Sequence, residues 1–80
     1  MLYFCKGGKV MSVSEQIKNI RQQSLMSQSD FANALGVSFS TVNRWENGKT
    51  LPTYRAMKSL ENFCKGKAID FIGLKNEWKD

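Results

Sequence analysis

Apolar residues in the middle of the chain recur at helical spacing and divide it into two short amphipathic segments. In the first segment, Phe31, Ala32 and Leu35 share one face, and Gly36 follows at once. Glycine enters the left-handed conformation that ends a helix without a steric penalty. The pattern therefore predicts a helix that begins after a Ser27 cap and ends at Gly36.

A second helix is predicted over residues 39–47, where Ser38 is placed to cap the first turn and Gly48 to end the last. At about 100° per residue, Val42 and Trp45 fall on the apolar side. The opposite side holds Ser40, Asn43, Arg44 and Asn47. Such a polar and cationic face suits a helix that lies in the major groove of DNA and touches base edges.

Further helices are predicted on both sides of this pair. Residues 14–23 carry Ile17 and Ile20 on one face. After the Leu-Pro break, Thr53 can cap a helix that ends at Gly66. Its apolar face holds Tyr54, Met57, Leu60 and Phe63.

The last stretch, residues 67–80, is dense in large apolar residues. Phe71, Leu74 and Trp78 fit one helical face despite Gly73 between them, which predicts a fifth helix that covers the core. Because exposed apolar patches usually mark interfaces, this segment is also expected to serve for dimerisation, with Trp78 or Phe71 near the axis. The predicted class is all-α, a small bundle of about five helices.

The length and net charge of the chain limit the number of domains and the kind of binding partner. The 80 residues suit one domain, placed at 11–80, and the net charge of +5 favours a polyanionic partner. The segment from Lys18 to Lys58 contains six Lys and Arg residues but only two acidic residues, Asp30 and Glu46. The positive charge is therefore concentrated around the two central helices.

Composition argues against several other functions. The chain has no histidine, and Cys5 and Cys64 lack zinc-ligand spacing, so no metal, cofactor or catalytic residue is predicted. It has no transmembrane run, and the short apolar patch at residues 2–5 is no signal peptide. These features indicate a protein of a reducing cytoplasm.

Residues 1–10 show no helical period and leave several interpretations open: a short strand, a disordered tail, a basic arm or a translated leader. The leader hypothesis rests on Lys6-Gly7-Gly8-Lys9, which purine-rich codons resembling a ribosome-binding sequence can encode, at ordinary spacing before Met11. Native translation would then begin at Met11. Amino-terminal sequencing of the native protein would test the leader hypothesis, since Met1 or Leu2 as the first residue would contradict it.

Four positions of the central stretch carry a family resemblance. Ala32, Gly36, Val42 and Trp45 lie four, six and three residues apart, and Glu-Asn-Gly-Lys follows directly. In this register the chain resembles the lambda-repressor and Cro-like (XRE-type) helix-turn-helix proteins, over roughly residues 17–63. The resemblance implies a lambda-repressor-like fold, in which Ala32 is small because the two helices cross closely.

The resemblance also pairs Arg21 with Glu46. Such a partly buried, bidentate ion pair would fix the angle of the second helix; the alternative is that both are solvated surface charges. Family members often have glycine at the position of Leu25. Here the connection after the first helix must use Ser24 or a strained Leu25.

Phosphate contacts are expected at two places. Gln28 resembles the family's first glutamine of helix two, whose side chain and helix N-terminus hold a phosphate. Asn47 and Lys49, with the backbone between them, resemble a second phosphate clamp. Arg55 and Lys58 on the next helix could extend that clamp as charges.

Base contacts are expected from Ser38, Phe39, Ser40, Asn43 and Arg44. Family members often carry glutamines at the positions of Phe39 and Ser40, and this chain departs from that pattern. Phe39 suits either a thymine methyl group or the flank of the core, and Arg44 suits either guanine or a phosphate. These residues do not define an operator sequence.

Together these features predict a sequence-specific, double-stranded DNA-binding transcriptional regulator, expected to be a repressor. It would bind a two-fold operator as a homodimer, with the helix at 39–47 in the major groove. The alternative is an antitoxin whose carboxy-terminal segment covers a toxin while its helix-turn-helix autoregulates the pair. RNA binding is disfavoured because the aromatic residues mostly fall on apolar faces.

Overall fold

The computed structural model describes residues 12–78, and five helices make up this part of the chain. They are α1 (Val13–Gln23), α2 (Gln28–Leu35), α3 (Phe39–Glu46), α4 (Tyr54–Lys67) and α5 (Ile72–Glu77). No strand occurs within residues 12–78, so the predicted all-α class is confirmed. The predicted tail or leader at residues 1–10 lies outside the described residues.

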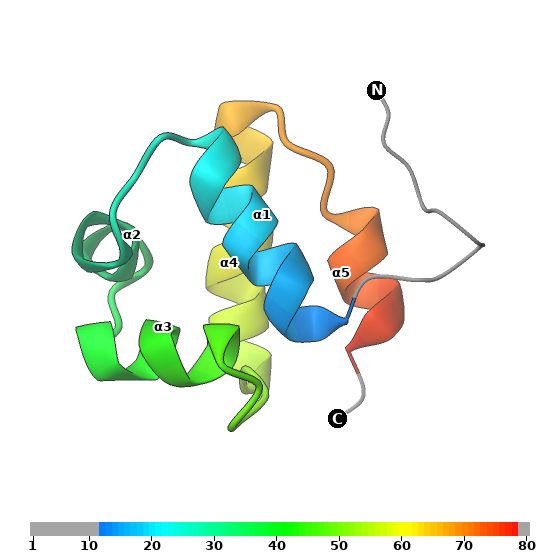
Figure 1. The fold of residues 1–80 in the computed structure, drawn as a ribbon. Helices are drawn as coiled ribbons and strands as arrows, with labels where there is room; N and C mark the ends of the chain where they lie inside the picture. The colour runs from blue at the N-terminus through cyan, green and yellow to red at the C-terminus, as the bar shows by residue number, and fades with distance from the viewer. Residues whose placement is uncertain (1–11, 79–80) are drawn as a thin grey trace.

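The helices α1 and α4 cross in the middle of the molecule, with α2 and α3 on one side and α5 on the other (Figure 1). Between them lies one core, to which all five helices contribute. The edge-to-face ring pair of Phe31 and Phe63, with centroids 5.2 Å apart, joins α2 to α4. The buried residues of this core are Val13, Ile17, Ile20, Phe31, Ala32, Leu35, Val42, Trp45, Ala56, Met57, Leu60, Cys64 and Leu74.

The first helix begins one residue earlier than predicted, because Ser12 caps it. The Glu15 backbone N–H donates to Ser12 Oγ at 3.3 Å, and the Ser12 backbone N–H donates to Glu15 Oε1 at 3.0 Å. This reciprocal arrangement is a capping box. The Ser-x-x-Glu pattern is present in the sequence, and it is a stronger start signal than Ser14.

The connection from α1 to α2 passes through a strained leucine. Leu25 has φ 58° and its side chain is 93% exposed. A branched side chain is disfavoured in the left-handed region, which explains why glycine suits this position. Of the two predicted alternatives, the strained Leu25 is the one the structure adopts, and the Ser24 backbone stays right-handed.

The predicted end of α4 at Gly66 is wrong. Thr53 caps the helix as predicted, with its Oγ1 accepting from the Ala56 N–H at 3.2 Å, but the helix runs through Gly66 to Lys67, and Ala68 is its C-cap. Ala68 takes the left-handed conformation with φ 58°. The following Ile69 packs against the core and its N–H donates to the Cys64 carbonyl at 2.9 Å, so burial of Ile69 decides where the chain turns.

The fifth helix is shorter than the predicted 67–80 segment. It covers residues 72–77 because Ala68 ends α4 and the Asp70 carboxylate then accepts from the Ile72 N–H at 3.0 Å. Leu74 is buried, whereas Phe71 and Trp78 pack at the edge of the core. The segment therefore covers this chain's own core, and its predicted role in dimerisation stays a prediction.

Candidate nucleic-acid interface

The turn between α2 and α3 is built by local capping. Ser27 Oγ accepts from the Asp30 N–H at 3.1 Å at the start of α2, and Gly36 ends that helix with φ 76°. The Val37 N–H then donates to the Ala32 carbonyl at 3.0 Å, and Ser38 Oγ caps α3 by accepting from the Thr41 N–H at 3.1 Å. Three residues thus separate the two helices.

The inner sides of the two helices hold them at a fixed angle. Ala32 is 2% exposed, Val42 is fully buried and Trp45 is 3% exposed. Gly36 lies at the surface, where only its left-handed backbone is required. Of the four residues in the spacing pattern, three therefore pack in the core, and the fourth, Gly36, forms the turn.

Arg21 of α1 and Glu46 of α3 form a bidentate ion pair. Arg21 Nε donates to Glu46 Oε2 at 2.7 Å and Nη2 donates to Oε1 at 3.0 Å, while Nη1 donates to the Met26 carbonyl at 3.0 Å. The Glu46 side chain is only 4% exposed and that of Arg21 is 15% exposed. The hydrogen bonds that Arg21 donates to Glu46 raise the pKa of Arg21 above its ordinary value, with burial opposing them and the charge of Glu46 adding to them. The pair anchors the end of α3 to α1.

Three side-chain amides extend from this ion pair, and we call them the amide relay: Gln28, Asn43 and Asn47. Gln28 Nε2 donates to Glu46 Oε1 at 3.0 Å, and Gln28 Oε1 accepts from Asn43 Nδ2 at 3.2 Å. Asn43 Oδ1 accepts in turn from Asn47 Nδ2 at 3.0 Å. Sequence reasoning assigned these residues to phosphate or base contacts one by one and missed their connection. Only the Asn43–Asn47 bond has a signal in the sequence, the i, i+4 spacing on a helix.

The outer face of α3 is exposed and free of carboxylates. Phe39 is 51% exposed, and Ser40 and Arg44 are also exposed. Ser38 is largely committed to capping, since its Oγ also bonds Thr41 Oγ1 at 2.8 Å. Of the predicted base-contacting residues, Phe39, Ser40 and Arg44 thus present their side chains most openly.

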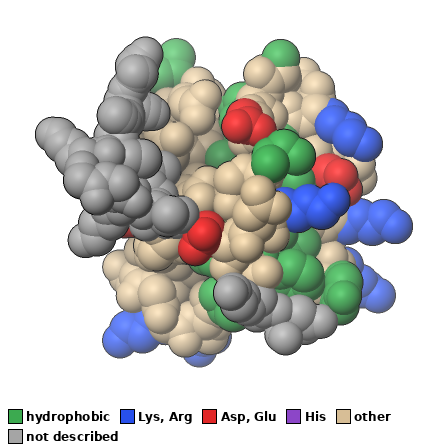
Figure 2. Space-filling view, turned by 90° about the vertical axis from the view of Figure 1, so that its right-hand side faces the viewer, with side chains coloured by type: hydrophobic (Ala, Val, Ile, Leu, Met, Phe, Trp, Pro, Cys, Tyr) green, Lys and Arg blue, Asp and Glu red, His purple; other side chains and the backbone are tan. Residues whose placement is uncertain are grey.

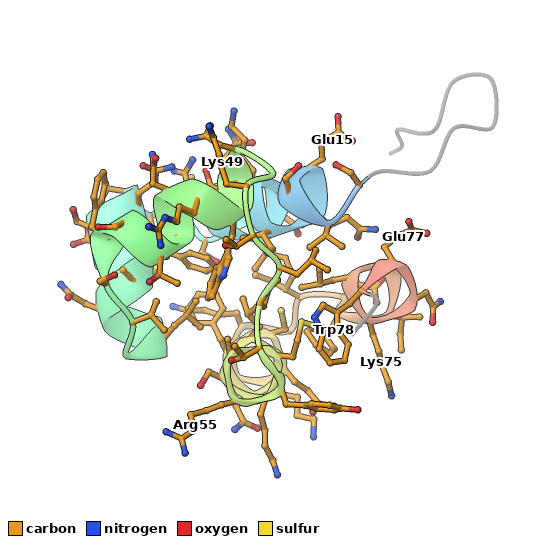
Figure 3. The ribbon with its side chains drawn as sticks, turned by 90° about the horizontal axis from the view of Figure 1, so that it is seen from below. Glu15, Lys49, Arg55, Lys75, Glu77 and Trp78 are labelled. Atoms are coloured by element: carbon orange, nitrogen blue, oxygen red, sulfur yellow. The ribbon has the colours of Figure 1, made fainter. Side chains whose placement is uncertain are left out.

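Lys49 follows α3 in the exposed loop after Gly48, which has φ 73°. The Lys49 backbone N–H donates to the Arg44 carbonyl at 2.9 Å, which keeps the loop folded against the end of α3. Figure 3 shows Lys49 and Arg55 on opposite sides of the molecule. Arg55 therefore does not extend the predicted clamp around Lys49.

Other kinds of site find no support in the part of the chain that the structure describes. Residues 12–78 contain no group of His, Cys, Asp or Glu side chains that could hold a metal ion. None of the helices in that span has the length and apolar character needed to cross a membrane. Cys64 is buried, and burial, with a smaller contribution from the charge of Asp70, raises the pKa of its thiol to about 11.

A short helix with an exposed polar face, held by a second helix across a three-residue turn, defines a helix-turn-helix DNA-binding domain. A profile of the helix-turn-helix family, of the Cro/C1 (XRE) type, matches residues 17–72. The chain belongs to this family, as its sequence pattern predicted. Family membership supports DNA binding and transcription regulation as its role.

Two relatives are similar to the chain over part of their length. An HTH-type transcriptional regulatory protein of Methanocorpusculum labreanum is 34% identical over 75 residues, which cover 92% of this chain and 23% of that protein. Type II methyltransferase M.SsoII of Shigella sonnei is 38% identical over 55 residues, which cover 65% of this chain and 14% of the methyltransferase. The chain thus spans less than a quarter of either relative. No solved structure gives a significant match.

Proposed function

We propose that the chain is a sequence-specific repressor that binds a two-fold symmetric operator in the bacterial cytoplasm as a homodimer, with α3 in the major groove. The observation that carries the proposal is the outer face of α3, where Phe39, Ser40 and Arg44 are exposed on a helix that is anchored on its other side. A rigid helix with a hydrogen-bonding and cationic outer face is what base readout needs.

Electrostatics support the same orientation. The one carboxylate of α3, Glu46, is neutralised by Arg21, while Arg44 and Lys49 stay exposed. Each cation that contacts a phosphate releases counterions and contributes about one unit to the log–log salt slope of binding. Arg44 and Lys49 are proposed to supply such contacts on the side of the domain that carries α3.

A homodimer is proposed because one such helix reads too little DNA. The eight residues of α3 span about 12 Å, so one domain reaches only part of a helical turn. Two copies on half-sites about 34 Å apart would double the contacts. Repression then needs only occupancy of the promoter.

The carboxy-terminal side offers a surface for the second copy. Phe71 and Trp78 line a groove with Tyr54, and the exposed Ile72 lies on the adjoining helix. Figure 2, which views the molecule from the side of α5, shows apolar side chains gathered beside Lys and Arg side chains. Because Phe71 and Trp78 also pack on their own core, we propose that Tyr54 and Ile72 contribute the apolar area at the axis.

The test of DNA recognition is fluorescence anisotropy on duplex DNA from directly upstream of the gene, against a scrambled duplex, across a salt series. We expect tight binding to the upstream duplex alone, with a log–log salt slope of several units. Arg44→Ala and Lys49→Ala should weaken binding, whereas Arg55→Ala, on the opposite side of the molecule, should leave it unchanged (Figure 3). Weak and equal binding to both duplexes would contradict autoregulation by this chain alone, and would favour a regulator of distant genes or an antitoxin that binds DNA only together with its partner.

Sedimentation equilibrium at tens of micromolar, with and without the preferred duplex, tests the homodimer. We expect two copies per duplex, and a shift to monomer in an Ile72→Lys variant that remains folded. A monomer under both conditions would contradict a two-fold operator.

A further inference from the structure

Gln28 uses both ends of its side-chain amide inside the protein. It is the first residue of α2, its side chain is half-buried, and it bridges the Glu46 carboxylate at 3.0 Å and the Asn43 amide at 3.2 Å. A side chain that only gripped a phosphate would need no such partners. The contacts therefore point to a role inside the domain.

The ionised Glu46 sets the direction of every hydrogen bond in the amide relay. A carboxylate only accepts, so Gln28 must turn its NH₂ group toward Glu46 and its carbonyl toward Asn43. Asn43 must then turn its NH₂ group toward Gln28, which leaves its carbonyl to accept from Asn47 at 3.0 Å. The Glu46 carboxylate thus fixes, for each amide of the relay, which way its NH₂ group and its carbonyl point.

For Asn43 this order has a chemical consequence on the recognition helix. Adenine presents an acceptor at N7 and a donor at N6 in the major groove, whereas guanine presents two acceptors. An amide that rotates by 180° exchanges its donor and acceptor and so changes the base edge that it fits. Because Gln28 holds the Asn43 amide, that amide has a single orientation of its donor and acceptor before DNA binds.

We propose that Gln28 is a positioning residue that determines base preference through Asn43, by fixing the direction of the Asn43 amide, and is not chiefly a phosphate anchor. This inference rests on the proposed function, because base preference exists only if α3 reads a specific duplex. It goes further by naming which residue outside α3 controls that reading.

Glutamine is required for this role at position 28. A glutamate there would face the Glu46 carboxylate with a second negative charge, and a methionine would match the length of the side chain but form neither hydrogen bond. Gln28→Met therefore removes the two bonds and keeps most of the packing. Arg44, exposed on the same helix as Asn43, takes no part in the amide relay and supplies a control.

The experiment begins with selection of preferred duplexes from a random library by the wild-type protein. Binding to every single-base-pair variant of the selected site is then measured for wild type, for the single variants Gln28→Met, Gln28→Ala, Asn43→Ala and Arg44→Ala, and for the double variants that combine Gln28→Met with Asn43→Ala or with Arg44→Ala. Thermal melts establish that each variant is folded at the assay temperature.

We expect Asn43→Ala to lose discrimination at particular base pairs by about tenfold, the effect of one side chain that reads a base edge. Both Gln28 variants should lose discrimination at those same positions. The Gln28→Met/Asn43→Ala double variant should be no worse than Asn43→Ala alone. Arg44→Ala should act at other positions or on all duplexes, and its effect should multiply with that of Gln28→Met.

Uniform weakening of all duplexes by the Gln28 variants would overturn the inference and restore the phosphate role. So would a loss of thermal stability with an unchanged preference profile, or an Asn43→Ala profile that equals the wild type. A wild-type protein with no preferred duplex would instead overturn the proposed function, and this inference with it.

Discussion

The Glu46 carboxylate is 4% exposed and is tolerated there because three N–H groups converge on it, two from Arg21 and one from Gln28. Breaking a buried ion pair from one side leaves an uncompensated charge, which costs more than the pair itself contributes. At the scale of single residues, this is where the domain is most sensitive to substitution.

Arg21→Ala should therefore lower the free energy of unfolding by about 3 kcal/mol. Arg21→Lys should lower it by less, because lysine keeps the charge but loses the bidentate geometry. Urea denaturation measures both, with Arg55→Ala as the exposed control. A midpoint for Arg21→Ala equal to that of the control would show that the pair is not buried in solution.

Leu25 is strained and almost fully exposed, so replacing it should stabilise the protein. Leu25→Gly relieves the left-handed strain, at the expense of more freedom in the unfolded chain, for an expected net gain of about 1 kcal/mol. Thermal unfolding should show a higher midpoint. Gly36→Ala, the reverse change at φ 76°, should lower the midpoint, and equal midpoints for both variants would contradict the argument.

The Cys64 thiol predicts a dependence of stability on alkaline pH. Its pKa is about 11 in the folded protein, against an ordinary value of 9.0, so the unfolded chain releases this proton first as pH rises. Stability from this group is complete below about pH 9 and is lost toward pH 11, by up to about 1.4 kcal/mol per pH unit. Urea denaturation at pH 7.5 and pH 10 should show a larger loss for wild type than for Cys64→Ala. Equal losses would show that the thiol does not contribute.

At the scale of elements, the end of α4 has its two small residues in unfavourable places. Gly66 lies inside the helix, and a Cβ added there would meet nothing within 4 Å, whereas Ala68 takes the left-handed conformation that suits glycine. Gly66→Ala and Ala68→Gly should each raise the free energy of unfolding by about 0.5–1 kcal/mol. The two gains should add nearly fully in thermal melts of the double variant, and a loss in either single variant would contradict this account of the helix end.

Elements also show where sequence patterns were sufficient. Ser27, Ser38 and Thr53 cap the helices that they were predicted to cap, because a cap depends on residues within one turn. Two predictions that failed, Gly66 as a helix end and a long helix over 67–80, concern places where burial decided the outcome, whereas the missed start of α1 is a local capping box at Ser12. Ile69 and Leu74 reach the core only because the chain turns at Ala68, despite the strain there.

At the scale of the whole molecule, α3 lies at the edge of the bundle (Figure 1), where Ser40 and Arg44 are exposed while Val42 and Trp45 complete the core. Lys49 and Arg55 lie on opposite sides of the molecule (Figure 3), and Arg44 is exposed on α3 itself. The net charge of the chain is only +5, so the proposed DNA-binding side is positive mainly because of where its basic residues lie.

By itself the sequence determined the all-α class, the two central helices and the buried positions Ala32, Val42 and Trp45, because capping and helical periodicity act over a few residues. Its resemblance to a family indicated the Arg21–Glu46 pair. Only the tertiary structure decided that Gln28 joins Glu46, 18 positions away, and that the Trp78 indole N–H donates to the Pro52 carbonyl, 26 positions away. Such contacts depend on how the helices cross, and no local pattern of residues encodes that angle.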